Sequence, residues 1–182
     1  MTVAGYVALL RGINVGSAKR MAMADLRASV ESLGFTSVRT LLQSGNVVFD
    51  APAGSDAAAL SSALEQAVVD GTGIRAAVVV LTAAQLRAIA AENPLLDAVT
   101  DPSRATITFV EGATDAAGRP DDAELAPEMV AFSPHAVYQW CPDGISKSRM
   151  PVRFFASLGP AATARNLRTV DKLLLMLDEL EA

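Results

Sequence analysis

The residues best suited to chemistry are cations and amides that lie beside glycine turns. The stretch Leu10-Arg11-Gly12-Ile13-Asn14-Val15-Gly16 follows an apolar run and sets two glycines four residues apart. Glycine adopts a positive φ without a steric penalty, so such a segment can leave a strand, turn sharply and present N–H groups to an anion. A plain turn explains the same pattern, because short glycine motifs are common by chance. The stretch is a candidate anion-binding loop or a simple turn.

A second group of cations follows near the other end of the chain. Gly144-Ile145-Ser146-Lys147-Ser148-Arg149 combines glycine with hydroxyls and cations, as phosphate-binding loops often do, although it is not a Walker A motif. Thr163-Ala164-Arg165-Asn166 surrounds the start of a helix expected over residues 166–180, where free backbone N–H groups favour an anion. An ordinary helix N-cap with solvated cations explains this second segment as well.

These residue types predict anion binding more clearly than catalysis. If the fold brings the basic segments together, they form a composite cleft between two halves that binds a phosphorylated or carboxylated small molecule. The candidate ligand-binding residues are Arg11, Asn14, Ser44, Asn46, Lys147, Arg149, Arg165 and Asn166. The motifs contain no paired carboxylates for general acid–base work, and no catalytic residue is assigned. Phosphoryl transfer by positioning and charge alone stays open, and so does the question of turnover.

The formal net charge of −5 conceals a segregation of charge along the chain. Residues 1–49 hold five Lys or Arg against two acids, and residues 144–172 hold six against one. Residues 50–143 hold four cations and fourteen acids. The two basic segments would attract an anion if they lie near each other, in spite of the overall acidity.

The single cysteine and the single histidine limit the remaining chemistry. Cys141 and His135 exclude an internal disulfide and a zinc site of paired Cys and His ligands, and neither a metal nor a cofactor is predicted. Cys141 follows an apolar and aromatic run, which favours a buried inert thiol over a nucleophile. His135 falls in an expected hairpin turn, far in sequence from Ser44, so a serine triad is disfavoured.

Composition bounds the class of protein. Of the 182 residues, 51% are hydrophobic and 19% are charged, which indicates a globular chain with one large domain or two small ones. Residues 1–10 lack the basic start and long apolar core of a signal peptide, and no apolar run approaches the roughly 20 residues of a membrane-spanning helix. A cytoplasmic location is predicted.

Apolar periodicity predicts the order βαββαβ in residues 1–93. Strands are expected over residues 3–10, 38–43, 47–50 and 76–81, and helices over residues 21–33 and from Ser55 or Asp56 to near Gly71. Ser44-Gly45-Asn46 marks a hairpin between the second and third strands. A further helix, capped by Thr82, ends at Asn93-Pro94. In this arrangement two helices cover one face of a four-stranded antiparallel sheet.

Residues 94–182 repeat this order in a weaker form, after a hinge expected over residues 94–103. A strand over 105–111, a short acidic helix or turn over 121–128 and a hairpin over 129–133 and 136–141 precede helices over 152–158 and 166–180. The last helix carries a regular apolar stripe. The chain is therefore predicted to be α+β, with halves of residues 1–93 and 94–182 and mostly antiparallel sheets with helices on one face.

The chain resembles a widespread bacterial family of uncharacterised proteins, a domain of unknown function whose members open with Leu-Arg-Gly-Ile-Asn-Val-Gly. Further matching stretches are Leu33-Gly34-Phe35, Gln43-Ser44-Gly45-Asn46-Val47-Val48-Phe49 and Thr163-Ala164-Arg165-Asn166. Leu167 stands where the family usually has tryptophan. The resemblance implies two ferredoxin-like halves, and it implies no established activity and no catalytic residues.

Two other classes of function compete with anion binding. Split βαββαβ sheets also bind single-stranded nucleic acid, which requires exposed aromatic side chains beside cations on a sheet face. Tyr6 and Phe49 are the candidates for that role in the first half. A structural or partner-binding module would instead expose a broad apolar patch.

Overall fold

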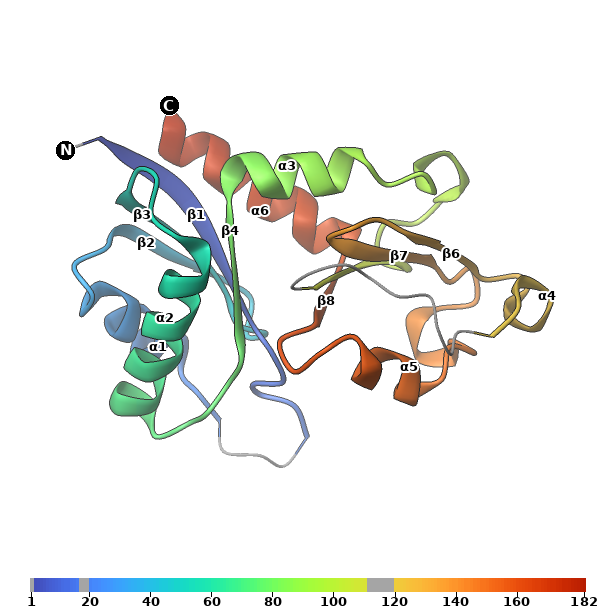
Figure 1. The fold of residues 1–182 in the computed structure, drawn as a ribbon, viewed down its shortest axis with the longest axis horizontal. Coiled ribbons are helices and arrows are strands. Elements are labelled where there is room, and N and C mark those ends of the chain that lie inside the picture. Colours follow the sequence, from blue (N-terminus) through green and yellow to red (C-terminus); the bar gives the residue numbers. More distant parts are fainter. Residues whose placement is uncertain (1, 17–19, 111–119) are drawn as a thin grey trace. The chain divides into compact units, whose positions relative to one another are not determined.

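The computed structural model describes residues 2–16, 20–110 and 120–182. The chain divides into two compact units, Met1–Arg87 together with Leu173–Ala182, and Ala88–Lys172 (Figure 1). The sequence-based division at residues 93 and 94 differs from these units in two respects. The chain passes between units inside helices rather than in the proline-containing hinge, and its last residues join the first unit.

The first unit is built on a four-stranded antiparallel sheet with the strand order β2-β3-β1-β4. Its strands are β1 (Val3–Leu10), β2 (Thr36–Leu41), β3 (Asn46–Pro52) and β4 (Val78–Thr82). The central strand β1 pairs with β3 and β4, so that Leu9 lies opposite Asn46 and Leu10 lies opposite Val78. The end of β1 is therefore beside the beginnings of β3 and β4.

Two helices, α1 (Met23–Glu31) and α2 (Ala57–Thr72), cover one face of this sheet (Figure 1). Tyr6, Ala8 and Leu10, alternate residues of β1, pack with Leu26 of α1 and Leu64 of α2 in a single apolar core. Alternate side chains of a strand point to the same face, which is why one half of β1 builds this core. The predicted β-strands and helices of residues 1–93 are confirmed, with ends shifted by a few residues.

The opposite face of the first sheet is also covered, by the second half of α6 (Leu167–Glu181). Gly5 precedes Tyr6 and faces away from α1 and α2, and a Cβ on Gly5 would lie 3.4 Å from Cδ2 of Leu177. The same Cβ would lie 3.9 Å from Cβ of Ala83, the first residue of α3 (Ala83–Ala91). This packing explains why residues 173–182 belong to the first unit, and why β1 is buried on both faces.

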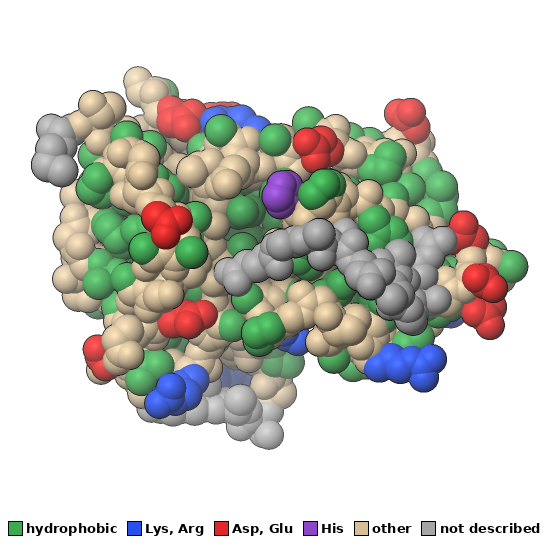
Figure 2. Space-filling view, in the orientation of Figure 1, with side chains coloured by type: hydrophobic (Ala, Val, Ile, Leu, Met, Phe, Trp, Pro, Cys, Tyr) green, Lys and Arg blue, Asp and Glu red, His purple; other side chains and the backbone are tan. Residues whose placement is uncertain are grey.

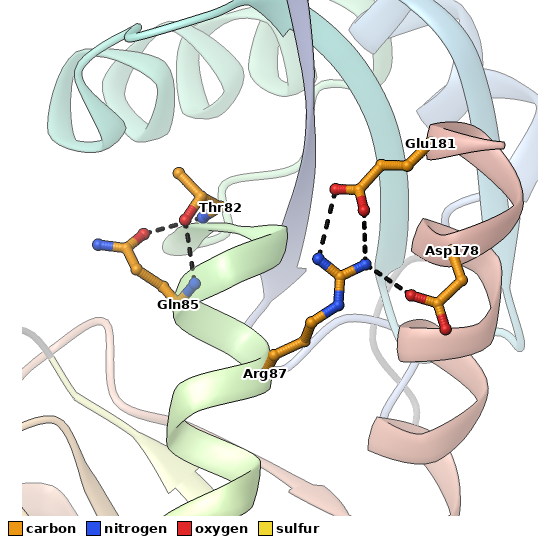
Figure 3. Close-up of polar contacts among 5 residues, drawn as sticks. All are labelled: Thr82, Gln85, Arg87, Asp178 and Glu181. Carbon is orange, nitrogen blue, oxygen red and sulfur yellow. Dashed lines mark hydrogen bonds and ion pairs between the residues drawn. The ribbon is translucent and has the colours of Figure 1, made fainter.

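Polar contacts also join α3 and the end of α6 (Figure 3). Nη2 of Arg87 lies 2.6 Å from Oδ1 of Asp178 and 2.7 Å from Oε2 of Glu181. These hydrogen bonds raise the pKa of the Arg87 guanidinium above its ordinary value. All three side chains are well exposed to solvent, so the pairs orient α6 and contribute at most about 1 kcal/mol of stability.

The N-terminus of α3 is capped as the sequence predicts. The backbone N–H of Gln85 donates to Oγ1 of Thr82 at 3.1 Å, and the N–H of Thr82 donates to Oε1 of Gln85 at 2.9 Å (Figure 3). These reciprocal bonds satisfy two backbone donors that a helix start would otherwise leave without partners.

The second unit repeats the topology of the first. Its strands are β5 (Ala105–Phe109), β6 (Met129–Phe132), β7 (Ala136–Trp140) and β8 (Thr163–Asn166), in the spatial order β6-β7-β5-β8. The helices α4 (Asp122–Leu125) and α5 (Val152–Ser157) follow β5 and β7 in the chain. Short 3₁₀ turns occupy Leu96–Ala98 and Ile145–Lys147. Each unit is a βαββαβ sheet in the order second, third, first and fourth strand, which is the ferredoxin-like arrangement.

The sequence analysis predicted no strand at residues 163–166, which form β8 directly before α6. Asn166 lies opposite Thr106 of β5, and Thr163 lies opposite Phe109. Thr163 and Arg165 are buried and Ala164 is exposed, so the alternation of a strand is present. A buried arginine hides that alternation from a hydrophobicity pattern. Glu111, the last residue of the predicted strand over 105–111, lies outside the described residues.

Among the helices of the described residues, none combines the length and the apolar character needed to cross a bilayer. In the same residues, no three His, Cys, Asp or Glu side chains are grouped closely enough to hold a metal ion.

We expect Leu177→Ala to destabilise the first unit by about 2–5 kcal/mol, because it leaves a cavity between α6 and β1. Leu177 is fully buried, whereas Leu175 on the same helix is 62% exposed. The matched control Leu175→Ala should therefore change the free energy of unfolding by less than about 0.5 kcal/mol. Urea denaturation followed by circular dichroism measures both values. Equal effects of the two substitutions would contradict the packing described here.

Candidate functional site

Two loops of the first unit meet at the end of β1. One loop follows β1 and leads to α1, and the other is the hairpin between β2 and β3. The N–H of Leu10 donates to the carbonyl oxygen of Gly45 at 2.8 Å, and the N–H of Arg11 donates to the carbonyl oxygen of Ala77 at 2.8 Å. The segment before β4 therefore lies at the same end of the sheet, and we call these three segments the first-unit loop cluster (residues 10–16 with 20–22, 42–46 and 74–78).

Backbone in the left-handed region is concentrated in this loop cluster. Positive φ values occur at Gly12, Asn14, Gly16, Leu42 and Gly45. Left-handed residues turn successive N–H groups toward one side, which is how backbone concavities bind anions. The predicted glycine turn is thus confirmed, and it is part of a wider set of turns.

Asn14 ties the two loops together. Its Nδ2 donates to the carbonyl oxygens of Met21 at 3.0 Å and Gln43 at 2.8 Å, and its Oδ1 accepts the N–H of Met21 at 2.7 Å. Both amide hydrogens are used inside the protein. The side chain predicted to bind a ligand has a positioning role in this structure.

Asn46 and Ser44 also make contacts within the hairpin. Asn46 is fully buried, and its Nδ2 donates to the carbonyl oxygen of Leu41 at 2.9 Å and to Oγ of Ser44 at 3.0 Å. The two residues shape the turn that Gly45 occupies. Of the four predicted residues of the first half, Arg11 is the one that brings a positive charge to the loop cluster.

Gly45 and Gly12 meet different surroundings. A Cβ on Gly45 would lie 2.7 Å from Cβ of Leu10, closer than real Cβ atoms approach one another, and a tight 3.0 Å from Cδ1 of Ile13. A Cβ on Gly12 would have no neighbouring atom within 4 Å, and Gly16 is equally open. Gly45 therefore permits a close approach of the two loops, whereas the backbone at Gly12 and Gly16 is accessible from outside.

Two further arginines belong to the first-unit loop cluster. Arg20 precedes Met21, the residue to which Asn14 bonds, and Arg75 lies two residues before Ala77, which accepts from the Arg11 N–H. Arg20 and Arg75 are exposed and Arg11 is half-buried. The sequence analysis missed Arg75, because it falls in the acidic middle of the chain. The pairing of β4 with β1 brings the segment that contains Arg75 to the end of β1.

In the second unit, Lys147 and Arg149 are exposed and share the loop of residues 144–150. Two of the donors that this loop would offer to a phosphate are already used. The Glu128 carboxylate, on a residue only 8% exposed, accepts from Oγ of Ser148 at 2.8 Å and from the backbone N–H of Arg149. Nε2 of Gln139 donates to the same carboxylate at 2.8 Å. Sequence reasoning placed Glu128 in a short acidic helix or turn and so missed this role.

Arg165 and Asn166 lie on β8, and both have roles inside the second unit. Arg165 is 9% exposed, and its Nη1 donates to Oγ1 of Thr163 at 2.8 Å and to the carbonyl oxygen of Ala164 at 2.8 Å. Burial lowers the pKa of the Arg165 guanidinium to about 10, which leaves it protonated at neutral pH. Oδ1 of Asn166 accepts the N–H of Thr169 at 2.9 Å, as a helix N-cap does.

Cys141 and His135 occupy sites that fit the sequence-based expectations. Cys141 is buried, and desolvation together with the nearby Glu128 carboxylate raises its pKa to about 12. The thiol is therefore protonated at neutral pH and does not act as a nucleophile. His135 is an exposed residue of the turn between β6 and β7 and is visible on the surface in Figure 2.

Both units are ferredoxin-like α+β folds, and the comparisons with known proteins identify the family to which they belong. Residues 3–138 match the model of the family described as Protein of unknown function (DUF1697). The chain belongs to this family. Its fold is similar to that of a solved structure described as conserved bacterial protein SP0830 from Streptococcus pneumoniae, with a TM-score of 0.72 and 23% sequence identity, over 97% of this chain and 99% of that one. No curated protein matches the chain.

We expect Gly45→Ala to destabilise the first unit more strongly than Gly12→Ala. Both residues have a positive φ, so each substitution costs about 1–2 kcal/mol in backbone conformation. Gly45→Ala adds overlap with Leu10 and Ile13, which should raise its total cost by about 1–3 kcal/mol more. Urea unfolding of both variants measures the difference. Equal costs would mean that the hairpin does not approach β1 as closely as described.

The Cys141 thiol should react with iodoacetamide at least about 100-fold more slowly in the folded protein than in urea at pH 8, because it is buried and protonated.

The pKa of the Cys141 thiol in the folded protein, about 12, lies above the ordinary value of 9, so the unfolded state loses the thiol proton first. The free energy of unfolding should therefore fall as the pH rises from 9 toward 12. The variant Cys141→Ala is the control, and it should lose this part of the pH dependence.

Proposed function

We propose that the protein binds a phosphorylated or carboxylated small molecule, and that the first-unit loop cluster supplies the principal anion site. The observation that supports this most directly is the gathering of left-handed backbone, open glycines and arginines at the end of β1. Gly12 and Gly16 leave their backbone accessible, and Arg11, Arg20 and Arg75 provide positive charge around them. No Asp or Glu occurs in these segments, and Oε1 of Glu65 on α2 contacts them by accepting the N–H of Val78 at 2.9 Å.

The physical basis is the combination of backbone donors with guanidinium groups. N–H groups in a turn carry partial positive charge, and an arginine adds a full charge with paired donors that suit phosphate and carboxylate oxygens. The Asn14 side chain holds the turn in place. The backbone N–H groups of the turn are therefore ordered before the ligand binds, which lowers the entropic cost of binding. The proposal concerns binding, and it assigns no catalytic residue.

The hypothesis taken from the sequence also includes Lys147, Arg149, Arg165 and Asn166. The exposed side chains of Lys147 and Arg149 fit contact with an anion better than the buried Arg165 does. We therefore keep Lys147 and Arg149 as secondary candidates of the second unit.

Nucleic-acid binding finds less support. The aromatic residues that this alternative requires on an open sheet face, Tyr6 and Phe49, are both buried in the core of the first unit. A single strand of nucleic acid needs both stacking side chains and a basic path.

Thermal unfolding in the presence of inorganic phosphate tests the proposed function. A site with a Kd of about 1 mM stabilises the folded state by about 1.8 kcal/mol at 20 mM phosphate, which raises Tm by about 4–7 °C in a protein of this size. Arg11→Ala should abolish the shift while the protein stays folded. Sodium chloride at the same ionic strength controls for general screening.

Arg27→Ala is the matched control, because Arg27 is also a half-buried arginine of the first unit but lies on α1, where Nη1 donates to Oγ1 of Thr40. It should retain the phosphate-dependent shift. No shift in the unmodified protein, or an equal loss in both variants, would contradict the proposal. Arg149→Ala tests the secondary candidates, and an unchanged shift would remove the loop of residues 144–150 from the hypothesis.

A further inference from the structure

Two exposed aliphatic side chains stand in the first-unit loop cluster. Val15 is 66% exposed and Leu42 is 54% exposed. Each adjoins one member of the Asn14–Gln43 hydrogen bond of 2.8 Å that joins the loops. The two aliphatic residues therefore belong to the same small region as the open glycines.

Leu42 is the most unusual residue of this region, because its backbone has a φ of 59°. A left-handed conformation costs a branched residue free energy that glycine or asparagine largely avoids. A buried leucine would recover that cost by packing, but this side chain is mostly in solvent. Strained residues that gain nothing within the fold are concentrated at ligand sites, so Leu42 is a candidate contact for a ligand.

The charge of the surrounding segments sets the rest of the ligand chemistry. Arg11, Arg20 and Arg75 belong to the same loop cluster, and its segments contain no acid. The cluster therefore offers cations and backbone N–H groups together with two aliphatic side chains. A small hydrophilic anion would contact the cations and the backbone N–H groups and leave the two aliphatic side chains in water.

On the basis of the proposed function, we propose that the natural ligand is an amphipathic anion, in which a phosphate or carboxylate is joined to an apolar group. Arg11 and the turn bind the anionic group, and Leu42 and Val15 contact the apolar group. Binding removes these aliphatic side chains from water, which offsets the conformational cost at position 42. Leu42 and Val15 are thus specificity-determining residues rather than residues needed for charge recognition.

Isothermal titration with inorganic phosphate and with phenyl phosphate tests this inference. The unmodified protein should bind phenyl phosphate about 10-fold more tightly than inorganic phosphate. In Leu42→Asn this preference should fall to about 3-fold or less. Asparagine tolerates the left-handed region, so the same variant should also unfold at an equal or higher temperature than the unmodified protein.

Ser37→Asn is the matched control. Ser37 lies on β2 with a φ of 55°, so the substitution makes a comparable backbone change outside the loop cluster. It should leave the preference for phenyl phosphate at about 10-fold. Val15→Ser is a second variant that should lower the preference without touching the left-handed residue.

The outcomes separate this inference from the proposed function. Equal affinity for both phosphates in the unmodified protein, or an unchanged preference in Leu42→Asn and Val15→Ser, would overturn the amphipathic ligand and leave anion binding intact. If neither phosphate binds, both the amphipathic ligand and the proposed function would be overturned. A preference that falls in the two loop variants and persists in Ser37→Asn would support the assignment.

Discussion

The close approach of the β2–β3 hairpin to the end of β1 constrains everything built at that end of the first unit. Leu10 and Ile13 leave no room for a Cβ at position 45, and the Leu10 N–H bonds directly to the Gly45 carbonyl oxygen. The hairpin must therefore turn tightly, with Leu42 and Gly45 both left-handed. Asn14 completes the connection from the other loop. These contacts hold the hairpin against the loop that follows β1.

Much of the fold could be predicted from the sequence, because its signals are local. The continuous apolar run of β1, the helical spacing of Leu60, Leu64 and Val68, and the capping residues Asp56 and Thr82 each depend on a few neighbouring positions. β8 was missed because its inward-facing residue is Arg165, which looks polar in a hydrophobicity pattern. The packing of α6 on the first sheet joins residues that are far apart in the chain, so no local sequence pattern predicts it.

The candidate site was only partly predictable for a related reason. Residue type identifies Asn14 and Asn46 as polar groups near turns. It does not reveal that the side-chain amides of both residues already donate to backbone carbonyl oxygens. Glu128 shows the converse, since a residue of a predicted short acidic helix or turn is a buried acceptor for Ser148 and Gln139. Arg75 joins the loop cluster only through strand pairing. Polar chemistry depends on which partners the fold supplies, and a single sequence does not state them.

The position of α6 also has a consequence for the order of folding during synthesis. Leu177 packs over Gly5, although the two residues are separated by most of the sequence. Residues 3–82 supply every strand of the first sheet and both helices of its main core, so one face can assemble early. The cover that α6 gives to the other face is absent until residues 173–181 have been synthesised. A nascent chain would therefore expose part of an apolar sheet surface throughout the synthesis of the second unit, which makes this interval an aggregation-prone stage.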